Sequence, residues 1–476
     1  MALRELMLSG AVAAGERLPA TRTLAGDLGL SRTTVIHAFD RLIAEGLIES
    51  RVGAGTYVAA ALGAERPQRP PEATRAAMIP REPRLSRAMG WAADRFGARP
   101  RLPHTPRPFI TALPAFDAFP MAQWARLAAK HWRGARDDVM GYGEPCGHPL
   151  LRRAIAAHLR ANRGIACEAQ QIFVVGGAQQ AFHLIGSLLL DPGDKVWFEN
   201  PGAIGARNSL LAGGADLVPV PVDHEGLRVD EGLRRCRQFR LAFVTPSHQQ
   251  PLGHVMSLER RFALLHAAER AGAWIIEDDY DGEFFFGRRP LPTLKSVDRT
   301  GLVIYVGTFS KSLFPALRLG FILAPPDLVE TFARVSAAFV QGVPSTVQAV
   351  VAEFIEEGHF ATHIRRMRRI YEERHAALCD AAATELAGLL DVVPAESGLH
   401  AISHLRPGIS EIAATAAAEA RRIVVSPIAR FSIEPTEVNG LVLGFAGVRP
   451  PAIRAGVEAL AAALQGLVRP RHAAAE

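Results

Sequence analysis

The sequence predicts two folded parts: a small winged helix-turn-helix, then a large α/β domain with a mostly parallel central sheet. Three observations lead to this prediction. The chain has 476 residues, more than one hydrophobic core usually serves. Its first 60 residues have the pattern of short helices followed by two short strands, which a glycine-rich turn connects. From about residue 110, apolar strand-like runs alternate with helical patterns.

Composition excludes several classes of protein. No run of about 20 apolar residues occurs, so we expect no membrane span. The first ten residues, MALRELMLSG, are too short and too mixed for a secretory signal peptide. The cysteines are scattered without metal-ligand spacing, at Cys146, Cys167, Cys236 and Cys379. We therefore expect a cytoplasmic protein with reduced thiols and no metal site.

The formal charge of +6 is concentrated in one stretch. Residues 1–60 hold six arginines and six acidic residues, whereas residues 61–110 hold ten arginines, four acidic residues and nine prolines. Proline at this density prevents a continuous helix or strand. We predict a semi-extended basic linker at 61–105, which separates a domain at 1–60 from one at 106–470. It is either a solvated tether or an additional, non-specific attraction for phosphates.

The N-terminal pattern predicts two helices and a turn. Leu24, Ala25 and Leu28 give the first helix an apolar face, and Gly29 suits a tight turn. Ser31 is a suitable N-cap for the second helix. In that helix Val35, Phe39 and Leu42 recur on one face, which we expect to be buried. This leaves the opposite face to solvent, with Arg32, Thr33, Ile36, His37 and Asp40. Gly46 ends the helix, and LIESRVGAGTYV predicts two strands around a turn.

Three motifs in this segment resemble the GntR family of transcription regulators. LPATRTLA, SRTTV and EGLIESRVGAGTYV follow one another within residues 3–58 in the order and spacing of that family. The resemblance implies that the second helix enters the major groove of operator DNA. The expected DNA-binding residues are Arg22, Arg32, Thr33, Thr34, His37, Gly55 and Thr56. The alternative is a winged helix that makes only protein contacts. The zero net charge of 1–60 favours help from a dimer or from the basic linker.

The large region places polar residues at its predicted strand ends. The strands are QIFVVGG, KVWFEN, LAFVTPS, AWIIEDD and LVIYVGTFS, with helices such as AQQAFHLIGSLLLD and LERRFALLHAAERAG between them. Ligands in such sheets bind at the carboxyl ends of the strands. We therefore expect one site built from these ends.

The residues at these ends suit pyridoxal 5′-phosphate. Lys311, one of four lysines in the chain, supplies an amine that forms a Schiff base with an aldehyde. A carboxylate at a buried strand end, Asp278, requires a cationic partner, and a protonated pyridine nitrogen is one. Tyr280 can donate to a phenolate oxygen. The phosphate donors are backbone N–H groups in the turn at Gly176, Gly177, Ala178 and Gln179, with Thr308, Ser310 and Arg318.

Residues from about 110 to 465 resemble fold-type I aminotransferases of class I. The motifs, in the expected order, are GYGEPCGHPLLRRAIAAHL, GGAQQA, ENPG, TPSHQQPLG, IIEDDYDGEF and GTFSKSLFPALRLGF. With the winged helix, the chain is similar to MocR/GabR-type regulators. The resemblance implies that Lys311 forms the imine, that Asp278 keeps the pyridine nitrogen protonated and that Tyr280 contacts the ring oxygen. Ala178, Gln179, Thr308 and Arg318 would hold the phosphate. Tyr142 would reach the phosphate of the other subunit, which implies a homodimer, arranged head-to-tail.

The sequence departs from the aminotransferase pattern at three positions. Ala203 stands where an aromatic residue near the cofactor ring is usual, and Gln250 stands where asparagine is common. Val442 occupies the position of the arginine that holds a substrate carboxylate. The candidate replacements are Arg207, Arg430 and Arg449.

These patterns lead to a functional hypothesis. We expect a transcription regulator that binds pyridoxal phosphate and operator DNA, and that senses an amine, an amino acid or the cofactor itself. The alternative is an active aminotransferase with an accessory DNA-binding module. The winged helix and linker favour the regulator because a plain transaminase needs neither. Residual transamination stays open because Lys311 and Asp278 are both present.

Overall fold

The computed structural model describes residues 2–51, 53–64, 86–98, 105–134, 137, 140–286, 290–340 and 342–468. The chain divides into two compact units, residues 1–84 and residues 85–476. Each is described by itself. Among the described residues, no helix combines the length and the apolar character needed to cross a bilayer.

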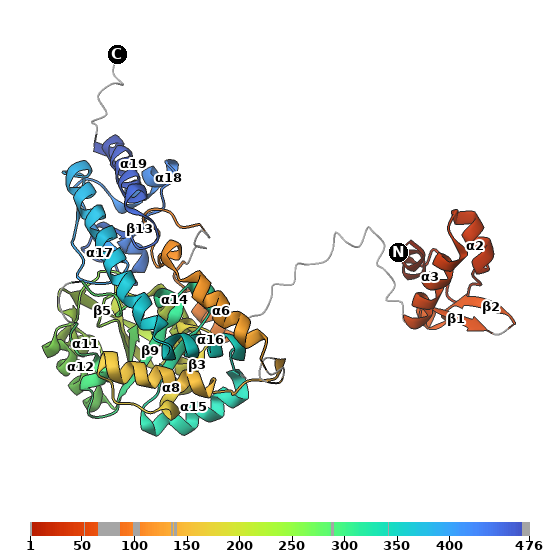
Figure 1. The fold of residues 1–476 in the computed structure, drawn as a ribbon, viewed down its shortest axis with the longest axis horizontal. Coiled ribbons are helices and arrows are strands. Elements are labelled where there is room, and N and C mark those ends of the chain that lie inside the picture. The colour runs from red at the N-terminus through yellow and green to blue at the C-terminus, as the bar shows by residue number, and fades with distance from the viewer. Residues whose placement is uncertain are drawn as a thin grey trace, which may run out of the picture. The chain divides into compact units, whose positions relative to one another are not determined.

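The first unit is the predicted winged helix-turn-helix (Figure 1). Its elements are α1 (Ala2–Ser9), α2 (Thr21–Leu28), α3 (Arg32–Ala44), β1 (Ile48–Arg51), β2 (Gly55–Val58) and α4 (Ala61–Ala64), with β1 and β2 antiparallel. Gly29 ends α2 at a φ of 65°, in the left-handed region that glycine tolerates. Ser31 caps α3 and accepts a hydrogen bond of 3.1 Å from the backbone N–H of Thr34.

The buried face of α3 is the predicted one. Val35, Phe39 and Leu42 are buried in the core of this unit. On the apolar face of α2, Ala25 is buried and Leu24 packs against the same core, whereas Leu28 is 58% exposed. Leu28 is the last residue of α2, beside the turn at Gly29, so it lies at the end of the helix that leaves the core.

The predicted linker is not semi-extended where the structure describes it. Residues Ala61–Ala64 form α4, and Arg87–Ala93 form α5, which Ser86 caps. The physical reason is local: no proline occurs between 86 and 98, whereas prolines are frequent on both sides. The rest of the predicted linker, 65–85 and 99–104, lies outside the described residues.

An eight-stranded sheet forms the centre of the second unit, in the order β3-β10-β9-β8-β7-β4-β5-β6. The five strands β9, β8, β7, β4 and β5 are parallel neighbours, and β10 is antiparallel to both β9 and β3. The strands are β3 (Ile172–Val175), β4 (Lys195–Asn200), β5 (Asp216–Asp223), β6 (Gly226–Leu227), β7 (Leu241–Val244), β8 (Trp274–Asp279), β9 (Val303–Thr308) and β10 (Gly320–Leu323). The five strands predicted from the sequence are β3, β4, β7, β8 and β9.

Helices cover both faces of this sheet (Figure 1), which suits the continuous apolar runs of β3 and β7. Alternate residues enter different cores: Ile172 and Val174 of β3 join one cluster, while Phe173 and Val175 join another. The longer helices are α6 (Met121–Trp132), α8 (Pro149–His158), α9 (Ala178–Leu189), α10 (Ile204–Ala212), α11 (Val229–Arg235), α12 (Leu258–Ala271), α15 (Val329–Val335) and α16 (Ser345–Glu356). The short helices α13 (Leu294–Val297) and α14 (Phe309–Ser312) follow β8 and β9.

A smaller antiparallel sheet, in the order β11-β12-β14-β13, completes the C-terminal part of the second unit (Figure 1). Its strands are β11 (Leu390–Val392), β12 (His400–Leu405), β13 (Ser426–Pro427) and β14 (Gly440–Gly444), and its helices are α17 (His359–Glu385), α18 (Glu411–Ala420) and α19 (Pro450–Val468).

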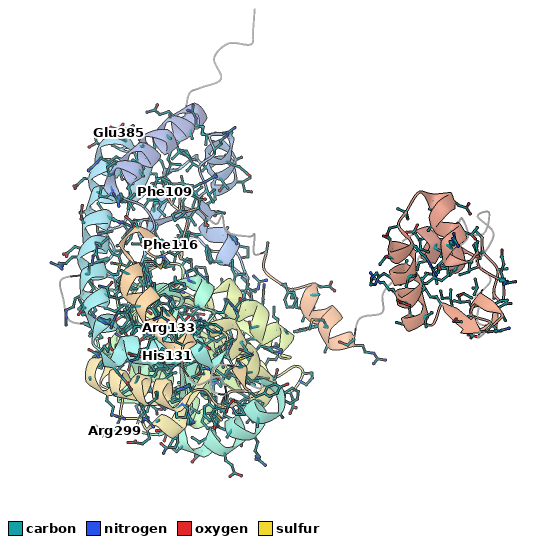
Figure 2. The ribbon with its side chains drawn as sticks, turned by 45° about the vertical axis from the view of Figure 1, so that its right-hand side comes forward. Phe109, Phe116, His131, Arg133, Arg299 and Glu385 are labelled. Atoms are coloured by element: carbon teal, nitrogen blue, oxygen red, sulfur yellow. The ribbon has the colours of Figure 1, made fainter. Side chains whose placement is uncertain are left out.

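This smaller sheet fixes a segment of backbone from far earlier in the chain. The N–H and the carbonyl of Phe109 bond to the carbonyl and the N–H of Gly444, at 3.0 and 3.1 Å. The Phe109 side chain is buried beside the C-terminal helices (Figure 2). Gly444 allows this approach because a Cβ there would lie 2.1 Å from the carbonyl oxygen of Ile110. Thr111 and Ala112, which follow, line the pocket described below.

We predict that Gly444→Ala destabilises the second unit by about 1–3 kcal/mol, because the added methyl overlaps backbone that cannot rotate away. The midpoint of urea denaturation of the full chain, followed by tryptophan fluorescence, measures the loss. The matched control is Gly466→Ala in α19, where a Cβ meets nothing within 4 Å and where alanine favours the helix. Equal midpoints for the two variants would contradict the prediction.

Candidate functional site

A pocket of about 190 Å³ opens at the carboxyl ends of β8 and β9. It brings together most of the residues that the sequence predicts for one site. The predicted residues that line it are Ala178, Gln179, Asp278, Tyr280, Thr308, Ser310, Lys311, Arg318 and Arg430. They come from four segments that are far apart in the sequence and that the tertiary fold brings together.

One end of the pocket suits a phosphate. The helix α9 begins there after Gly177, which has a φ of 103° and offers no side chain as a cap. The N–H groups of Ala178 and Gln179 at the start of α9 have no intrahelical acceptor, and the helix dipole favours an anion at this point. The guanidinium of Arg318 lies 3.6 Å from where a Cβ on Gly177 would stand. Thr308 caps the next helix and accepts from the N–H of Ser310 at 3.2 Å.

The other end holds a carboxyl group without a partner. Asp278 is the fifth residue of β8, is buried, and its Oδ1 makes no hydrogen bond among the described residues. Burial raises the pKa of Asp278 well above its usual value, and the nearby carboxylates of Asp279 and Asp281 raise it further. A buried carboxyl that lines a pocket fits a cationic ring nitrogen, whose charge would stabilise the carboxylate. The residues present thus fit pyridoxal phosphate.

Lys311 lies on α14, between these two ends. Its Nζ donates a hydrogen bond of 2.9 Å to the carbonyl of Ala112, in the segment that Gly444 fixes. A primary amine is therefore held at the pocket wall by backbone from far earlier in the chain. No pattern in the sequence predicts the contribution of Thr111 and Ala112, because it depends on that long-range pairing.

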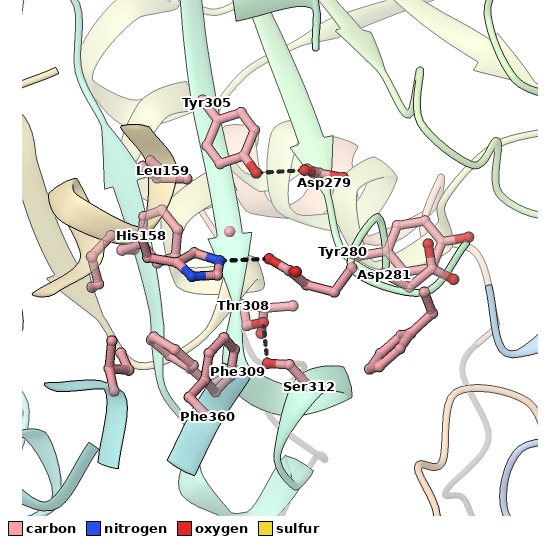
Figure 3. Close-up of a pocket in the computed structure, with 16 residues that line it drawn as sticks. His158, Leu159, Asp279, Tyr280, Asp281, Tyr305, Thr308, Phe309, Ser312 and Phe360 are labelled. Atoms are coloured by element: carbon pink, nitrogen blue, oxygen red, sulfur yellow. Dashed lines mark hydrogen bonds and ion pairs between the residues drawn. The ribbon is translucent and has the colours of Figure 1, made fainter. Parts of the chain in front are cut away.

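The next residue of β8, Asp279, faces the opposite side of the sheet, because successive residues of a strand alternate. Asp279 pairs with the buried guanidinium of Arg163 and accepts from the hydroxyl of Tyr305 (Figure 3). Nearby, the ring of His158 bonds to Glu283 at 2.7 Å. The Oδ2 of Asp279 thus has charged and polar partners, although Oδ1 has none among the described residues on either Asp278 or Asp279.

The loop of TPSHQQPLG is attached to ENPG by a buried carboxyl group. Glu199 accepts from the N–H and hydroxyl of Thr245, at 3.1 and 2.6 Å, and from the amide of Gln249 at 3.1 Å. Burial raises the pKa of Glu199 to about 7. This network places Gln250 in the pocket wall, at the position where aminotransferases commonly have asparagine.

The other departures also lie at the pocket. Ala203 lines it, and the aromatic side chains in the lining are Phe182, Tyr280 and Phe431. Val442 lines a small adjoining cavity with Lys311 and His400. An apolar side chain therefore stands where the aminotransferase arginine is expected.

Three predicted residues do not line the pocket. Tyr142 is 97% exposed. Arg207 donates to the carbonyls of Arg95 and Ser432, at 2.9 and 3.2 Å, and burial lowers the pKa of its guanidinium. Arg449 pairs with Asp117 at 2.8 Å and is 73% exposed. Of the three candidate arginines, only Arg430 therefore reaches the pocket.

The candidate DNA-binding residues lie on α2, α3 and the wing. Arg32, Thr33 and His37 are exposed, as the helical pattern predicts, and so is Arg22. The Thr34 hydroxyl is engaged locally with that of Ser31 at 2.8 Å. Gly55 and Thr56 lie in β2. On β1, the guanidinium of Arg51 lies 4.7 Å from the ring centre of Tyr57 across the wing.

Comparisons with known proteins match both units. Residues 1–58 match the family described as bacterial regulatory proteins, gntR family, and residues 114–460 match aminotransferase class I and II. The probable rhizopine catabolism regulatory protein MocR of Rhizobium meliloti is 42% identical over 98% of this chain and 92% of its own length.

The chain belongs to the MocR-type transcription regulators.

Other relatives of this MocR-type regulator include both regulators and enzymes. The pyridoxine biosynthesis regulator PdxR of Corynebacterium glutamicum is 29% identical over 93% of this chain and 90% of its own length. The α-aminoadipate aminotransferase LysN of Thermus thermophilus, solved with N-(5′-phosphopyridoxyl)-L-leucine, has a TM-score of 0.70. It is 29% identical and covers 76% of this chain and 92% of that one. The MocR-type regulator thus has a DNA-binding GntR domain and an aminotransferase-like domain of fold type I.

We predict that Asp278→Asn stabilises the ligand-free regulator by about 1–3 kcal/mol at pH 8, because it removes a buried carboxyl with an unpaired oxygen. The folded carboxyl has the higher pKa, so the native state binds more protons than the unfolded state above about pH 4. Wild-type stability therefore falls with rising pH relative to the variant.

Urea denaturation at pH 5, 7 and 8 without cofactor measures this difference. Asp327→Asn, at an exposed aspartate, is the control. A difference between the Asp278 variant and wild type that does not grow with pH would be the contrary result.

Proposed function

We propose that this regulator binds pyridoxal 5′-phosphate through Lys311 and uses the occupied pocket to sense an amine, an amino acid or the cofactor itself. The observation that carries the proposal is the buried carboxyl of Asp278, which lines one pocket with a lysine and with the first residues of α9. The winged helix then links the state of that pocket to operator DNA.

Each pocket residue has a proposed task. When bound, pyridoxal phosphate supplies an aldehyde that condenses with a primary amine with loss of one water. Lys311 provides that amine, Asp278 holds the pyridine nitrogen in its protonated state, and Tyr280 donates to the ring oxygen. The phosphate would be held by Thr308, Arg318 and the backbone of Ala178 and Gln179.

We also propose a head-to-tail homodimer. Tyr142 is 97% exposed and lies outside its own pocket, which suits a side chain that completes the phosphate site of a second copy. Two winged helices in one dimer would double the number of contacts with the phosphates of DNA. These additional contacts would compensate for the zero net charge of residues 1–60.

A route from pocket to DNA is suggested by the docking segment, residues 95–98, which precedes the aminotransferase-like domain in the chain. Asn208 bonds to both the carbonyl and the N–H of Gly97, at 3.0 and 2.8 Å. Arg207 donates to the carbonyl of Arg95, and Arg430 donates to that of Ala98 at 3.3 Å.

Arg430 connects the docking segment to the pocket, because it donates to the carbonyl of Ala98 and also lines the pocket. An effector carboxylate beside Arg430 competes with the Ala98 carbonyl for the guanidinium, because a carboxylate is charged and can pair with a guanidinium through two parallel hydrogen bonds, which a neutral carbonyl cannot. Effector binding thereby favours a different arrangement of the docking segment. We assign effector recognition to Arg430 and place Arg207 as its neighbour on the same segment.

Borohydride reduction of the regulator incubated with pyridoxal phosphate is expected to fix the label on Lys311, because no other lysine lines the pocket among the described residues. Peptide mass spectrometry locates the label. Lys311→Ala should lose the label and the absorption band of the bound cofactor. Lys195→Ala is the control, since Lys195 is an exposed partner of Asp216. A label on another residue would show that the assignment of the lysine is wrong.

The regulatory role is tested by titrating the protein on its own upstream DNA, with and without pyridoxal phosphate and a panel of amines and amino acids. We expect tight binding whose affinity changes at least several-fold with the effector. Arg430→Gln should retain the cofactor band but lose the response to carboxylate-bearing effectors. Arg449→Gln, at an exposed arginine outside the pocket, should retain both. Rapid turnover of amino donor and keto acid, with no specific DNA binding, would instead support the aminotransferase.

A further inference from the structure

A buried histidine and aspartate lie behind Tyr280, and the proposed cofactor chemistry does not use them. His248 belongs to the TPSHQQPLG loop, and Asp281 follows Tyr280 directly. The side chains of His248 and Asp281 are 0% and 1% exposed. The Nδ1 of His248 lies 2.9 Å from Oδ2 of Asp281 and 2.9 Å from the hydroxyl of Tyr280.

We propose that His248, held by Asp281, is a positioning residue that directs the hydroxyl proton of Tyr280 into the pocket. The inference rests on the proposed binding of pyridoxal phosphate, because the proton would be donated to the ring oxygen of that cofactor. It adds two residues to the site that no motif assigns to it.

The direction follows from the hydrogen-bonding capacity of one nitrogen. A neutral imidazole carries its proton on either Nδ1 or Nε2. With the proton on Nδ1, the ring donates to the carboxylate of Asp281. With the proton on Nε2, two lone pairs would face each other at 2.9 Å, and an N–H would be buried unpaired. The Nε2 of His248 has no partner among the described residues, so only the first arrangement avoids an orphan donor.

The consequence for Tyr280 is simple. When Nδ1 of His248 carries the proton, it has no lone pair to accept the Tyr280 hydroxyl. The Tyr280 hydroxyl, 2.9 Å from this nitrogen, therefore cannot donate to it, and its proton is available to another acceptor. Tyr280 lines the pocket beside Lys311 and Asp278, so that acceptor is a ligand in the pocket.

The surrounding backbone is shaped to admit this pair. A Cβ on Gly398 would lie 2.1 Å from Cε1 of His248 and 2.8 Å from Oδ2 of Asp281, and its φ of 84° also favours glycine. His400 packs against His248 with ring centres 4.8 Å apart, and its Nε2 lies 3.0 Å from the carbonyl of Pro251. Burial lowers the pKa of His400 to about 4, so this neighbour is neutral and can donate to that carbonyl.

The same three side chains, His248, Asp281 and His400, offer ligand atoms within 4.8 Å of one another. A metal ion bound there would have to displace the hydrogen bonds that His248 and His400 already make. A hydrogen-bonded network, by contrast, uses all of these contacts and leaves them in place.

The test uses the full chain loaded with pyridoxal phosphate and follows the pH midpoint of its absorption change. A hydroxyl that donates to the ring oxygen stabilises the deprotonated chromophore, so its loss raises the midpoint. We expect Tyr280→Phe to raise the midpoint by about one pH unit. His248→Leu should raise it in the same direction, and the double variant should show no more than the Tyr280→Phe shift.

The conservative variant His248→Asn should keep the wild-type midpoint, because its amide nitrogen can replace Nδ1 as the donor to Asp281. The second variant is Asp281→Asn. Without the carboxylate, the proton of His248 is no longer held on Nδ1, so the midpoint should shift upward. Circular dichroism checks that each variant is folded.

The inference is overturned if His248→Leu and Asp281→Asn bind the cofactor with a wild-type midpoint while Tyr280→Phe shifts it, or if the shifts of His248→Leu and Tyr280→Phe add. Absence of any cofactor band in the wild-type protein has a different meaning, since it overturns the proposed function and this inference together.

Discussion

The site depends on a carboxyl group that the fold buries without satisfying it. Asp278 stands at the end of a parallel strand, with an oxygen that has no partner among the described residues. Its neighbour Asp279 has an arginine and a tyrosine on Oδ2, although its Oδ1 also lacks a partner among the described residues. Asp278 differs because it lines the pocket, where a ligand can supply a partner for a buried carboxyl that otherwise lowers stability.

The rest of the pocket is held by contacts between segments distant in sequence. Gly444 fixes the backbone of Phe109, and the backbone that follows accepts from Lys311. Glu199 fixes the loop that carries His248 toward Tyr280. Buried contacts to strands and helices anchor this backbone, which gives the rigidity that a binding site requires. Sensing then needs one element that moves, and the docking segment, residues 95–98, is bonded to an arginine of the pocket wall.

Much of this was predictable because the relevant signals are local. The alternation of apolar runs predicted five strands of the large sheet, and the strand-end rule predicted which residues would share a pocket. The helix cap at Ser31 and the buried face of α3 also follow from short-range patterns. One local prediction failed, because the proline-free part of the predicted linker forms a helix.

The sequence by itself determined the order of the two domains, the strand ends that carry chemistry, and the lysine, aspartate and glycines of the pocket. These depend on residue type and on spacing within a few turns or one strand. Only the tertiary structure decided that Arg430, not Arg207 or Arg449, lines the pocket, and that His248 lies behind Tyr280. The reason is physical: long-range pairing sets which side chains meet, and periodicity carries no information about contacts between segments far apart in the chain.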